Sequence, residues 1–230
     1  MGGGWLMRWL IACERSGRVR SAFRKLGHDT WSCDLEPADD GDPHHLQMDA
    51  IEAAYTLPWD GMIAHPECTF LANSGSKHLY AGMRKENGPA PDRWAKMGFA
   101  AHFYLTLRRA PIRRKVIENP IMLGHPRRLF GIPRHTQIIQ PWMFGDFETK
   151  ATGLDIIGLL PLIPQFVTWQ DCRDFLGLPT DAKPVERVHR MAPGPDRQRL
   201  RSETYPGIAD AFAQQFGGEA PTQRSLELVA

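Results

Sequence analysis

Short apolar runs alternate with amphipathic stretches along most of this chain. The runs at 7–12, 30–33, 61–64 and 114–117 have the length and flanking turn residues of buried strands. Helices are predicted between them, at 17–26, 49–55 and 93–108; the first has apolar Val19, Ala22, Phe23 and Leu26 on one face and arginines on the other. This alternation predicts an α/β protein with a mostly parallel sheet and helices on both faces.

The second half of the chain is less regular. Two further strands, able to pair antiparallel, are predicted at 137–143 and 154–159, and a last helix at 208–216. The polar, glycine-containing stretch 70–92 is expected to form a mobile loop or partial helix over the site. We expect one domain over 1–230, with its core at 7–160 and 202–217, a small lobe or connector at 161–201 and a loose tail at 218–230.

Charge and composition narrow the class of protein. The net charge of +2 is too small to attract nucleic acid by itself, so basic residues matter only where they cluster. Such clusters form either a stripe that follows the phosphates of a nucleic acid or ordinary solvated faces. No apolar run is long enough to span a bilayer, and no secretory signal is evident. The four cysteines are widely spaced, which favours reduced thiols in a cytoplasm and gives no reason to expect a metal site.

Cys68 is the most informative residue. It follows the predicted strand 61–64 in the run His65-Pro66-Glu67-Cys68, and a second strand, 114–117, runs directly into Glu118-Asn119. Ligands of open α/β sheets bind at such strand ends, so a thiol and a carboxyl there suit covalent chemistry assisted by a proton donor. The competing interpretations are a small buried hydrophobic residue for Cys68 and a salt bridge with an arginine for Glu118.

The first predicted strand opens into a turn just before a helix, where small residues let backbone amides approach a ligand. Asp34 ends the second strand about twenty residues later, where an acid can accept hydrogen bonds from ribose hydroxyls. Asp49 lies where a third acid can touch an adenine amino group. The alternatives are a turn residue for Asp34 and a helix cap for Asp49.

Taken in order, these stretches resemble the cytosine-5 DNA methyltransferases, and more narrowly their short phage and prophage members. The resemblance covers about residues 8–217 and is carried by the runs Ile11-Ala12-Cys13-Glu14, Gly27 to Asp34, Ala64 to Leu71, Ile117-Glu118-Asn119-Pro120, Gln140 to Asp146 and Tyr205-Pro206-Gly207-Ile208-Ala209. It implies a Rossmann-like fold, S-adenosylmethionine as cofactor, and DNA with a flipped cytosine as substrate.

The resemblance also implies roles for individual residues. The catalytic set is Cys68 as nucleophile, Glu118 at ring nitrogen 3, Asn119 orienting the loop, and Glu67 and Lys150 beside them. The cofactor set is Ala12, Cys13, Glu14, Ser16, Gly17, Asp34, Leu35, Asp49, Ala50, His65 and Pro66. The expected phosphate contacts are Lys77, Arg84, Lys85, Arg187, Arg190, Arg197, Arg199 and Arg201.

The chain departs from the family pattern at three places. Glu67 replaces the second proline of Pro-Pro-Cys, and a carboxylate close to the thiol would raise its pKa. Lys150 stands near the place of a paired arginine, and only 160–201 is available for target recognition. Two alternatives therefore stay open: a pyrimidine-modifying enzyme acting on nucleotides, and a nucleic-acid-binding homologue with little catalysis.

Overall fold

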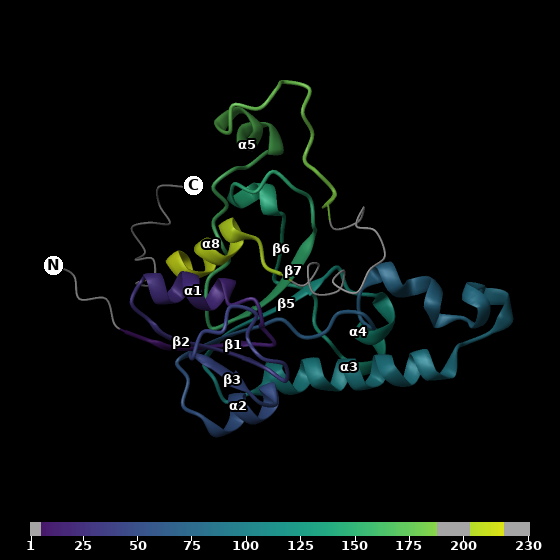
Figure 1. Cartoon of the computed structure of the whole chain (residues 1–230). Helices are drawn as coiled ribbons and strands as arrows, with labels where there is room; N and C mark the ends of the chain where they lie inside the picture. The colour runs from purple at the N-terminus through teal and green to yellow at the C-terminus, as the bar shows by residue number, and fades with distance from the viewer. Residues whose placement is uncertain (1–5, 188–202, 219–230) are drawn as a thin grey trace.

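The computed structural model describes residues 6–187 and 203–218 and is built on a seven-stranded sheet of order β3-β2-β1-β4-β5-β7-β6 (Figure 1). The strands are β1 (Arg8–Ala12), β2 (Asp29–Asp34), β3 (His45–Gln47), β4 (Gly61–Ala64), β5 (Arg114–Pro120), β6 (Gln137–Ile139) and β7 (Thr152–Ile157). The first five along the chain run parallel, whereas β7 is antiparallel to both β5 and β6.

The strand order reverses between β1 and β4. From β1 the chain moves outward through β2 and β3, then returns to place β4 and β5 on the other side of β1. Ala12 and Ala64, the last residues of β1 and β4, are register partners, so the loops that follow them start side by side. Doubly wound sheets bind ligands at such a reversal, beyond the carboxyl ends of the strands.

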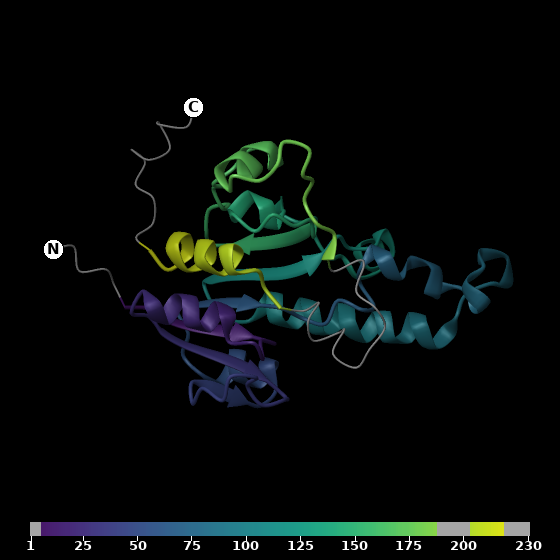
Figure 2. The same ribbon diagram turned by 45° about the horizontal axis from the view of Figure 1, so that its top comes forward.

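Helices cover both faces of the sheet (Figures 1 and 2). Helices α1 (Arg18–Lys25) and α8 (Pro206–Phe216) lie side by side on one face. Helices α2 (Ala50–Thr56) and α3 (Pro91–Arg109) cover the other, and α4 (Gly124–Phe130) packs against α3. The predicted α/β class, with a mostly parallel Rossmann-like sheet between two helical layers, is confirmed.

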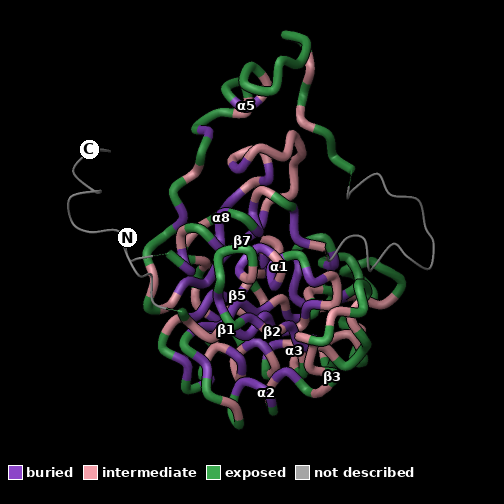
Figure 3. The backbone as a smooth tube through the Cα atoms, turned by 60° about the vertical axis from the view of Figure 1, so that its left-hand side comes forward, coloured by how far each residue is buried: buried purple, intermediate pink, exposed green. Residues whose placement is uncertain are grey.

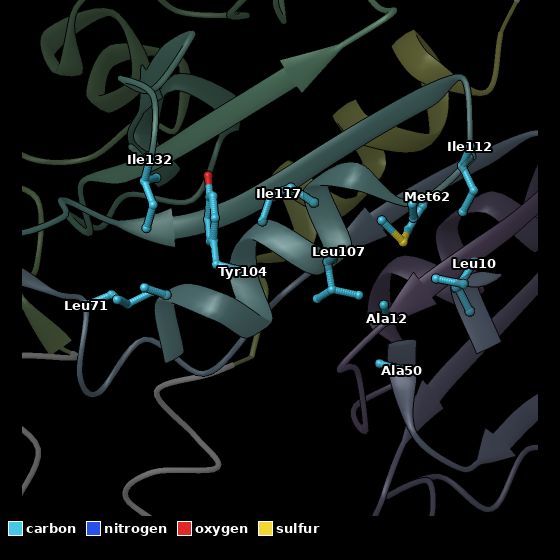
Figure 4. Close-up of a cluster of buried hydrophobic side chains, with 14 of the residues drawn as sticks. Leu10, Ala12, Ala50, Met62, Leu71, Tyr104, Leu107, Ile112, Ile117 and Ile132 are labelled. Carbon is cyan, nitrogen blue, oxygen red and sulfur yellow. The ribbon is translucent and has the colours of Figure 1, made fainter. Parts of the chain in front are cut away.

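Alternate strand residues build the two cores because side chains alternate across a sheet. Leu10, Met62 and Ile117 point toward α3, where they meet Leu107 and Tyr104 (Figure 4). Their neighbours in sequence point toward α1 and α8, where Phe23 is fully buried. Burying a phenylalanine of this kind stabilises the fold by about 2–3 kcal/mol, so these layers hold the strand ends in place.

Several elements differ from the sequence predictions. The edge strand β3 was not predicted, because His45-Leu46-Gln47 is short and mostly polar. The predicted strand 137–143 ends at Ile139, and Pro141, which lacks an N–H, begins the 3₁₀ helix η4 (Pro141–Phe144). Helix α4 was not predicted either. The strand predicted at 114–117 continues to Pro120 because β7 pairs along its whole length, so Glu118 and Asn119 lie within β5.

Two segments extend from the sheet. Residues 73–87 form the 3₁₀ helices η1 (Asn73–Leu79), η2 (Ala81–Met83) and η3 (Lys85–Asn87), which run outward beside the start of α3 (Figures 1 and 2). For the stretch 70–92 the sequence predicts either a mobile loop or a partial helix, and the structure has short helices there. Helix α5 (Trp169–Phe175) stands apart from the main body and is mostly exposed (Figure 3).

Candidate functional site

The turn after β1 is shaped by Cys13 and Glu14. Cys13 has φ 59°, in the left-handed region that non-glycine residues rarely adopt, so the main chain turns sharply there. Glu14 is buried, and its two carboxylate oxygens accept hydrogen bonds from the backbone N–H groups of Val19 (2.7 Å) and Arg20 (3.2 Å). Glu14, a predicted cofactor residue, thus accepts hydrogen bonds from backbone N–H groups that have no partner within the first turn of α1. The sequence did not indicate this role.

The two acids predicted to bind a cofactor both have local structural roles. Asp34 Oδ1 accepts a hydrogen bond from the backbone N–H of Glu36, which closes a turn. Asp49 Oδ1 accepts from the N–H groups of Ile51 (2.7 Å) and Glu52 (3.1 Å), so Asp49 is the N-cap of α2. In both acids these bonds use Oδ1 and leave Oδ2 out of the local structure. Of their neighbours in the predicted set, Ala50 is buried and Leu35 is exposed.

Negative charge converges around Cys13. Burial raises the pKa of the Cys13 thiol strongly, and the carboxylates of Asp34 and Asp49 raise it further. Burial and the nearby Asp34 likewise raise the pKa of Cys33 to about 12. These electrostatic effects reflect the closeness of the ends of β1 and β2 to the start of α2. They also keep both thiols protonated at neutral pH.

Ser16 and Gly17 lie on the helical side of this turn. With Arg18, Lys25 and Asp210 they line a pocket of about 260 Å³ between α1 and α8. A second pocket, of about 400 Å³, lies near Arg8, Trp59 and Asp60 at the opposite ends of the strands. Neither pocket includes Cys68 or Glu118, so we locate the candidate site from its side chains.

The most informative contact joins β5 to the loop after β4. His65 Nδ1 lies 2.8 Å from Glu118 Oε2, and both side chains are only about a tenth exposed (10% and 12%). Burial lowers the pKa of His65, but the Glu118 carboxylate outweighs it and the net shift is upward. Burial raises the pKa of Glu118, but His65 outweighs it and the net shift is downward. Both directions favour a buried imidazolium–carboxylate pair.

Two other charged side chains act on this pair. Glu14 favours the protonated imidazole of His65, whereas Lys150 opposes it and lowers the pKa of Glu118. Lys150 is thus within electrostatic reach of Glu118, as its assignment to the catalytic set requires. His65, predicted only as a cofactor residue, also belongs to the Glu118 environment. The only sequence feature that indicates the contact between His65 and Glu118 is that each residue directly follows a predicted strand, and those strands end at 64 and 117.

Some polar atoms at these strand ends have no partner. Among the described residues, none bonds to His65 Nε2 or to the side-chain Oδ1 and Nδ2 of Asn119, although all three atoms are buried. Asn119 is opposite Gly153 across the β5–β7 pair. The His135 ring fills the space where a Gly153 side chain would be, and both its nitrogens are also unpartnered. Unsatisfied buried polar atoms are rare and call for an explanation, which a catalytic role or a bound water would supply.

The Cys68 loop is fastened on both sides. The Cys68 carbonyl accepts hydrogen bonds from the N–H groups of Leu71 (3.0 Å) and Ala72 (2.8 Å), and Ala72 forms an isolated bridge with Met122 beyond β5. Pro66 is buried, Glu67 is exposed and Cys68 is half-buried. The structure therefore brings the Cys68 loop and the segment after Glu118 together, with the Glu67 side chain turned toward solvent.

Tyr205 lies in a cluster of charged side chains beside Lys150. Its hydroxyl donates to Glu148 Oε2 (2.6 Å), and Arg187 Nε donates to both oxygens of the same carboxylate (2.9 and 3.1 Å). The Arg187 guanidinium and the Lys150 ammonium lie 5.5 and 5.8 Å from the Tyr205 ring centroid. Arg187, predicted to contact phosphate, is thus already paired with a carboxylate.

The other predicted phosphate contacts fall into two groups. Lys77, Arg84 and Lys85 are exposed along the 3₁₀ segment 73–87. Arg190, Arg197, Arg199 and Arg201 lie outside the described residues.

Across 6–187 and 203–218 no group of three or more histidine, cysteine or acidic side chains is arranged to hold a metal ion. In the same residues no helix combines the length and apolarity needed to cross a membrane.

Comparisons with known proteins assign neither a family nor a reaction to this chain. No protein-family model matches this chain, and no curated protein matches it. One similar solved structure is described as a DNA modification methyltransferase encoded within a prophage (E. coli), with 13% identity, a TM-score of 0.40, and coverage of 81% of this chain and 55% of that one. The S. pombe Dnmt2 methyltransferase is 12% identical with a TM-score of 0.35, covering 82% and 56%. The chain spans little more than half the length of either, and similarity at this level assigns no reaction to it.

Proposed function

We propose that this protein transfers a methyl group from S-adenosylmethionine to carbon 5 of cytosine in DNA, with Cys68 as the covalent nucleophile. The observation that carries the proposal is the convergence of the Cys68 loop with Glu118 at the ends of two adjacent parallel strands. The His65–Glu118 bond and the Ala72–Met122 bridge hold the two segments together. This edge lies next to the point where the strand order reverses.

The residues at the ends of β1 and β2 fit the cofactor. S-adenosylmethionine carries a sulfonium and an ammonium group, and Asp34 and Asp49 supply negative charge near Cys13. Asp34 would accept hydrogen bonds from the ribose hydroxyls and Asp49 from the adenine amino group, each through the Oδ2 that its local structure leaves unused. When bound, the cofactor supplies the methyl group.

The Cys68 thiolate would add to carbon 6 of the flipped cytosine. The new carbon–sulfur bond breaks the aromaticity of the ring and makes carbon 5 nucleophilic enough to accept a methyl group. After methylation a base removes the carbon 5 proton, the double bond re-forms and the thiolate leaves. Cys68 therefore ends each cycle unchanged.

The His65–Glu118 pair changes the expected role of the acid. Because His65 holds the pKa of Glu118 below its ordinary range, Glu118 is ionised at neutral pH. An ionised Glu118 accepts a hydrogen bond from the cytosine amino group, and the proton for ring nitrogen 3 would come from the pair as a unit, with His65 as its reservoir. The proton that leaves would be the one on Nδ1, which faces Glu118, and ring nitrogen 3 would return it through Glu118 to Nδ1 when the thiolate leaves.

DNA would be held mainly by charge. Lys77, Arg84 and Lys85 follow one exposed segment that leaves the Cys68 loop, which suits contact with successive phosphates. Taking the target base out of the duplex costs a few kcal/mol, which these contacts and the pocket for the base would have to supply. Arg187 contributes less, because Glu148 already neutralises it.

Trapping with 5-fluorocytosine DNA tests the proposal. Fluorine at carbon 5 blocks the final elimination, so the Cys68 adduct accumulates and is seen as a protein–DNA band on a denaturing gel. The adduct should form with wild type and cofactor, disappear in Cys68→Ser, and persist in the control Cys172→Ala, whose thiol is buried under α5. A wild-type protein that binds cofactor and DNA but forms no adduct would overturn the proposal.

A second assay separates the substrates. Transfer of a labelled methyl group to duplex DNA, and none to free dCMP, is expected. Transfer to dCMP alone would show that the substrate is a free nucleotide and not DNA. Binding of cofactor and DNA without transfer, unchanged in Cys68→Ser, would instead identify a binding protein.

A further inference from the structure

Arg93 reaches from the first turn of α3 back to the loop that carries Cys68. Its Nη2 donates a hydrogen bond to the backbone carbonyl of Thr69, the residue after Cys68. Its guanidinium carbon lies 4.4 Å from the centroid of the Phe70 ring, within the range of a cation–π interaction. One side chain thus contacts two consecutive residues directly beyond the thiol.

Gly75 leaves the space that the guanidinium occupies. A Cβ at Gly75 would lie 2.5 Å from Arg93 Nη2 and 3.2 Å from the Thr69 carbonyl oxygen, both too close for an ordinary contact. The φ of Gly75 is not in the left-handed region, so the need for glycine here is one of space. The Nε of Arg93 is buried as well. The guanidinium therefore packs against Thr69, Phe70 and Gly75, with Arg93 itself half-buried.

Arg93 also faces the charge of Glu67. Burial lowers the pKa of Arg93, and the Glu67 carboxylate opposes that effect, which places the two charges within electrostatic reach. Glu67 is exposed and precedes Cys68 directly. An unscreened carboxylate at that position would disfavour the thiolate.

We propose that Arg93 is the positioning residue of the Cys68 loop, fixing its main chain at Thr69 and Phe70 and offsetting the charge of Glu67. A second proline in place of Glu67 would stiffen the chain through its ring; here a side chain from α3 supplies the restraint from outside the loop. The restraint itself is independent of the reaction, whereas its consequence for catalysis rests on the proposed function.

Hydrogen exchange of the full-length protein, followed by mass spectrometry, measures the restraint. The informative amides are those of Leu71 and Ala72, which bond to the Cys68 carbonyl. Exchange should be about fivefold faster or more in Arg93→Met, since one lost hydrogen bond of ordinary strength has that effect. Lys96→Met is the matched control, because Lys96 Nζ lies 5.9 Å from the same ring and makes no bond to the Thr69 carbonyl; it should leave the exchange unchanged.

Gly75→Ala keeps the charge of Arg93 while its Cβ displaces the guanidinium and crowds the Thr69 carbonyl, so it tests the contact between the two even if Arg93→Met does not fold. It should accelerate the same amides, whereas the control Gly98→Ala, whose Cβ meets only Phe130 at 3.5 Å, should not. Wild-type protection of Leu71 and Ala72 in the folded Arg93 and Gly75 variants would overturn the proposal.

The charge effect needs a double-mutant cycle. The rate of Cys68 alkylation by iodoacetamide at fixed pH should fall about two- to fivefold on adding Arg93→Lys, which moves the cation, or Arg93→Met to wild type, but less when Glu67→Gln is already present. Equal effects in both backgrounds would overturn the screening role. If wild type alkylates and exchanges as expected yet traps no 5-fluorocytosine DNA, the proposed function fails and the role of Arg93 stands.

Discussion

The two halves of the sheet's carboxyl edge treat their polar side chains differently. At the ends of β1 and β2, Glu14, Asp34 and Asp49 all accept hydrogen bonds from nearby backbone amides. At the ends of β4 and β5, His65 and Asn119 keep buried polar atoms without a partner. In the first half the acids are tied to the main chain, and a ligand there would use only the oxygens left over. In the second half the His65–Glu118 pair joins two adjacent strand ends beside the Cys68 loop, which is why we propose the chemistry there.

Replacing His65 with Gln should have the largest effect on stability, because it leaves Glu118 as a buried carboxylate without its cation. We expect the free energy of unfolding to fall by about 3 kcal/mol at pH 6. The raised pKa of His65 makes its contribution full below about pH 6.5 and lost as the pH rises through the folded-state value. The lowered pKa of Glu118 makes its contribution present above about pH 4.3 and lost as the pH falls.

Urea unfolding from pH 4 to 9 measures this window. The difference between wild type and His65→Gln should be largest near pH 5–6.5 and shrink toward pH 9. His44→Gln is the control, because His44 is half-exposed and bonds Asp42 in an outer loop, so its loss should cost less than about 1 kcal/mol. An equal cost of His65→Gln at pH 6 and pH 9 would contradict the ion pair.

Glu14→Ala should come second, with a loss of about 2 kcal/mol in chemical unfolding, because two backbone N–H groups at the start of α1 lose their acceptor. Glu36→Ala removes an exposed carboxylate from the neighbouring loop and should change stability by less than about 0.5 kcal/mol. Similar losses in the two variants would show that the β1 end does not depend on Glu14.

Asp49 allows the cap and the cofactor role to be separated. Asp49→Ala should cost about 1 kcal/mol, whereas Asp49→Asn keeps a capping oxygen and should cost little. If the acid also contacts the cofactor, both variants should weaken the binding of S-adenosylmethionine in calorimetry. Unchanged binding in Asp49→Asn would leave Asp49 with a capping role alone.

Lys150→Met should have the smallest effect, a shift in the titration of His65. Lys150 disfavours the protonated imidazole, so removing its charge should move the pKa of His65 further upward. NMR titration of the histidine rings measures the shift, and Lys183→Met, an exposed lysine beyond α5, should leave it unchanged. An unchanged pKa of His65 would place Lys150 outside the Glu118 environment.

Local pattern was enough to predict most strands of the sheet, but not the contacts that the side chains at their ends make. The Val-Ile and Leu-Ile runs identify strands because a buried parallel strand needs continuous apolar side chains. The His65–Glu118 bond depends on the register that pairs Ala64 with Ile117, and the reach of Arg93 to Thr69 depends on where α3 begins. Both contacts join segments that are far apart in the sequence, so no short stretch of sequence could predict them. Strand β3 was missed for the opposite reason, because its three residues carry almost no apolar signal.

The cluster around Tyr205 has a consequence for engineering. Glu148 accepts hydrogen bonds from both Arg187 and Tyr205, and Arg18 pairs with Glu203, so the chain is anchored to the main body just before and just after residues 188–202. Because one carboxylate serves both sides, the single substitution Glu148→Ala would loosen the chain before and after that stretch at once, whereas Arg18 and Glu203 would keep their pair.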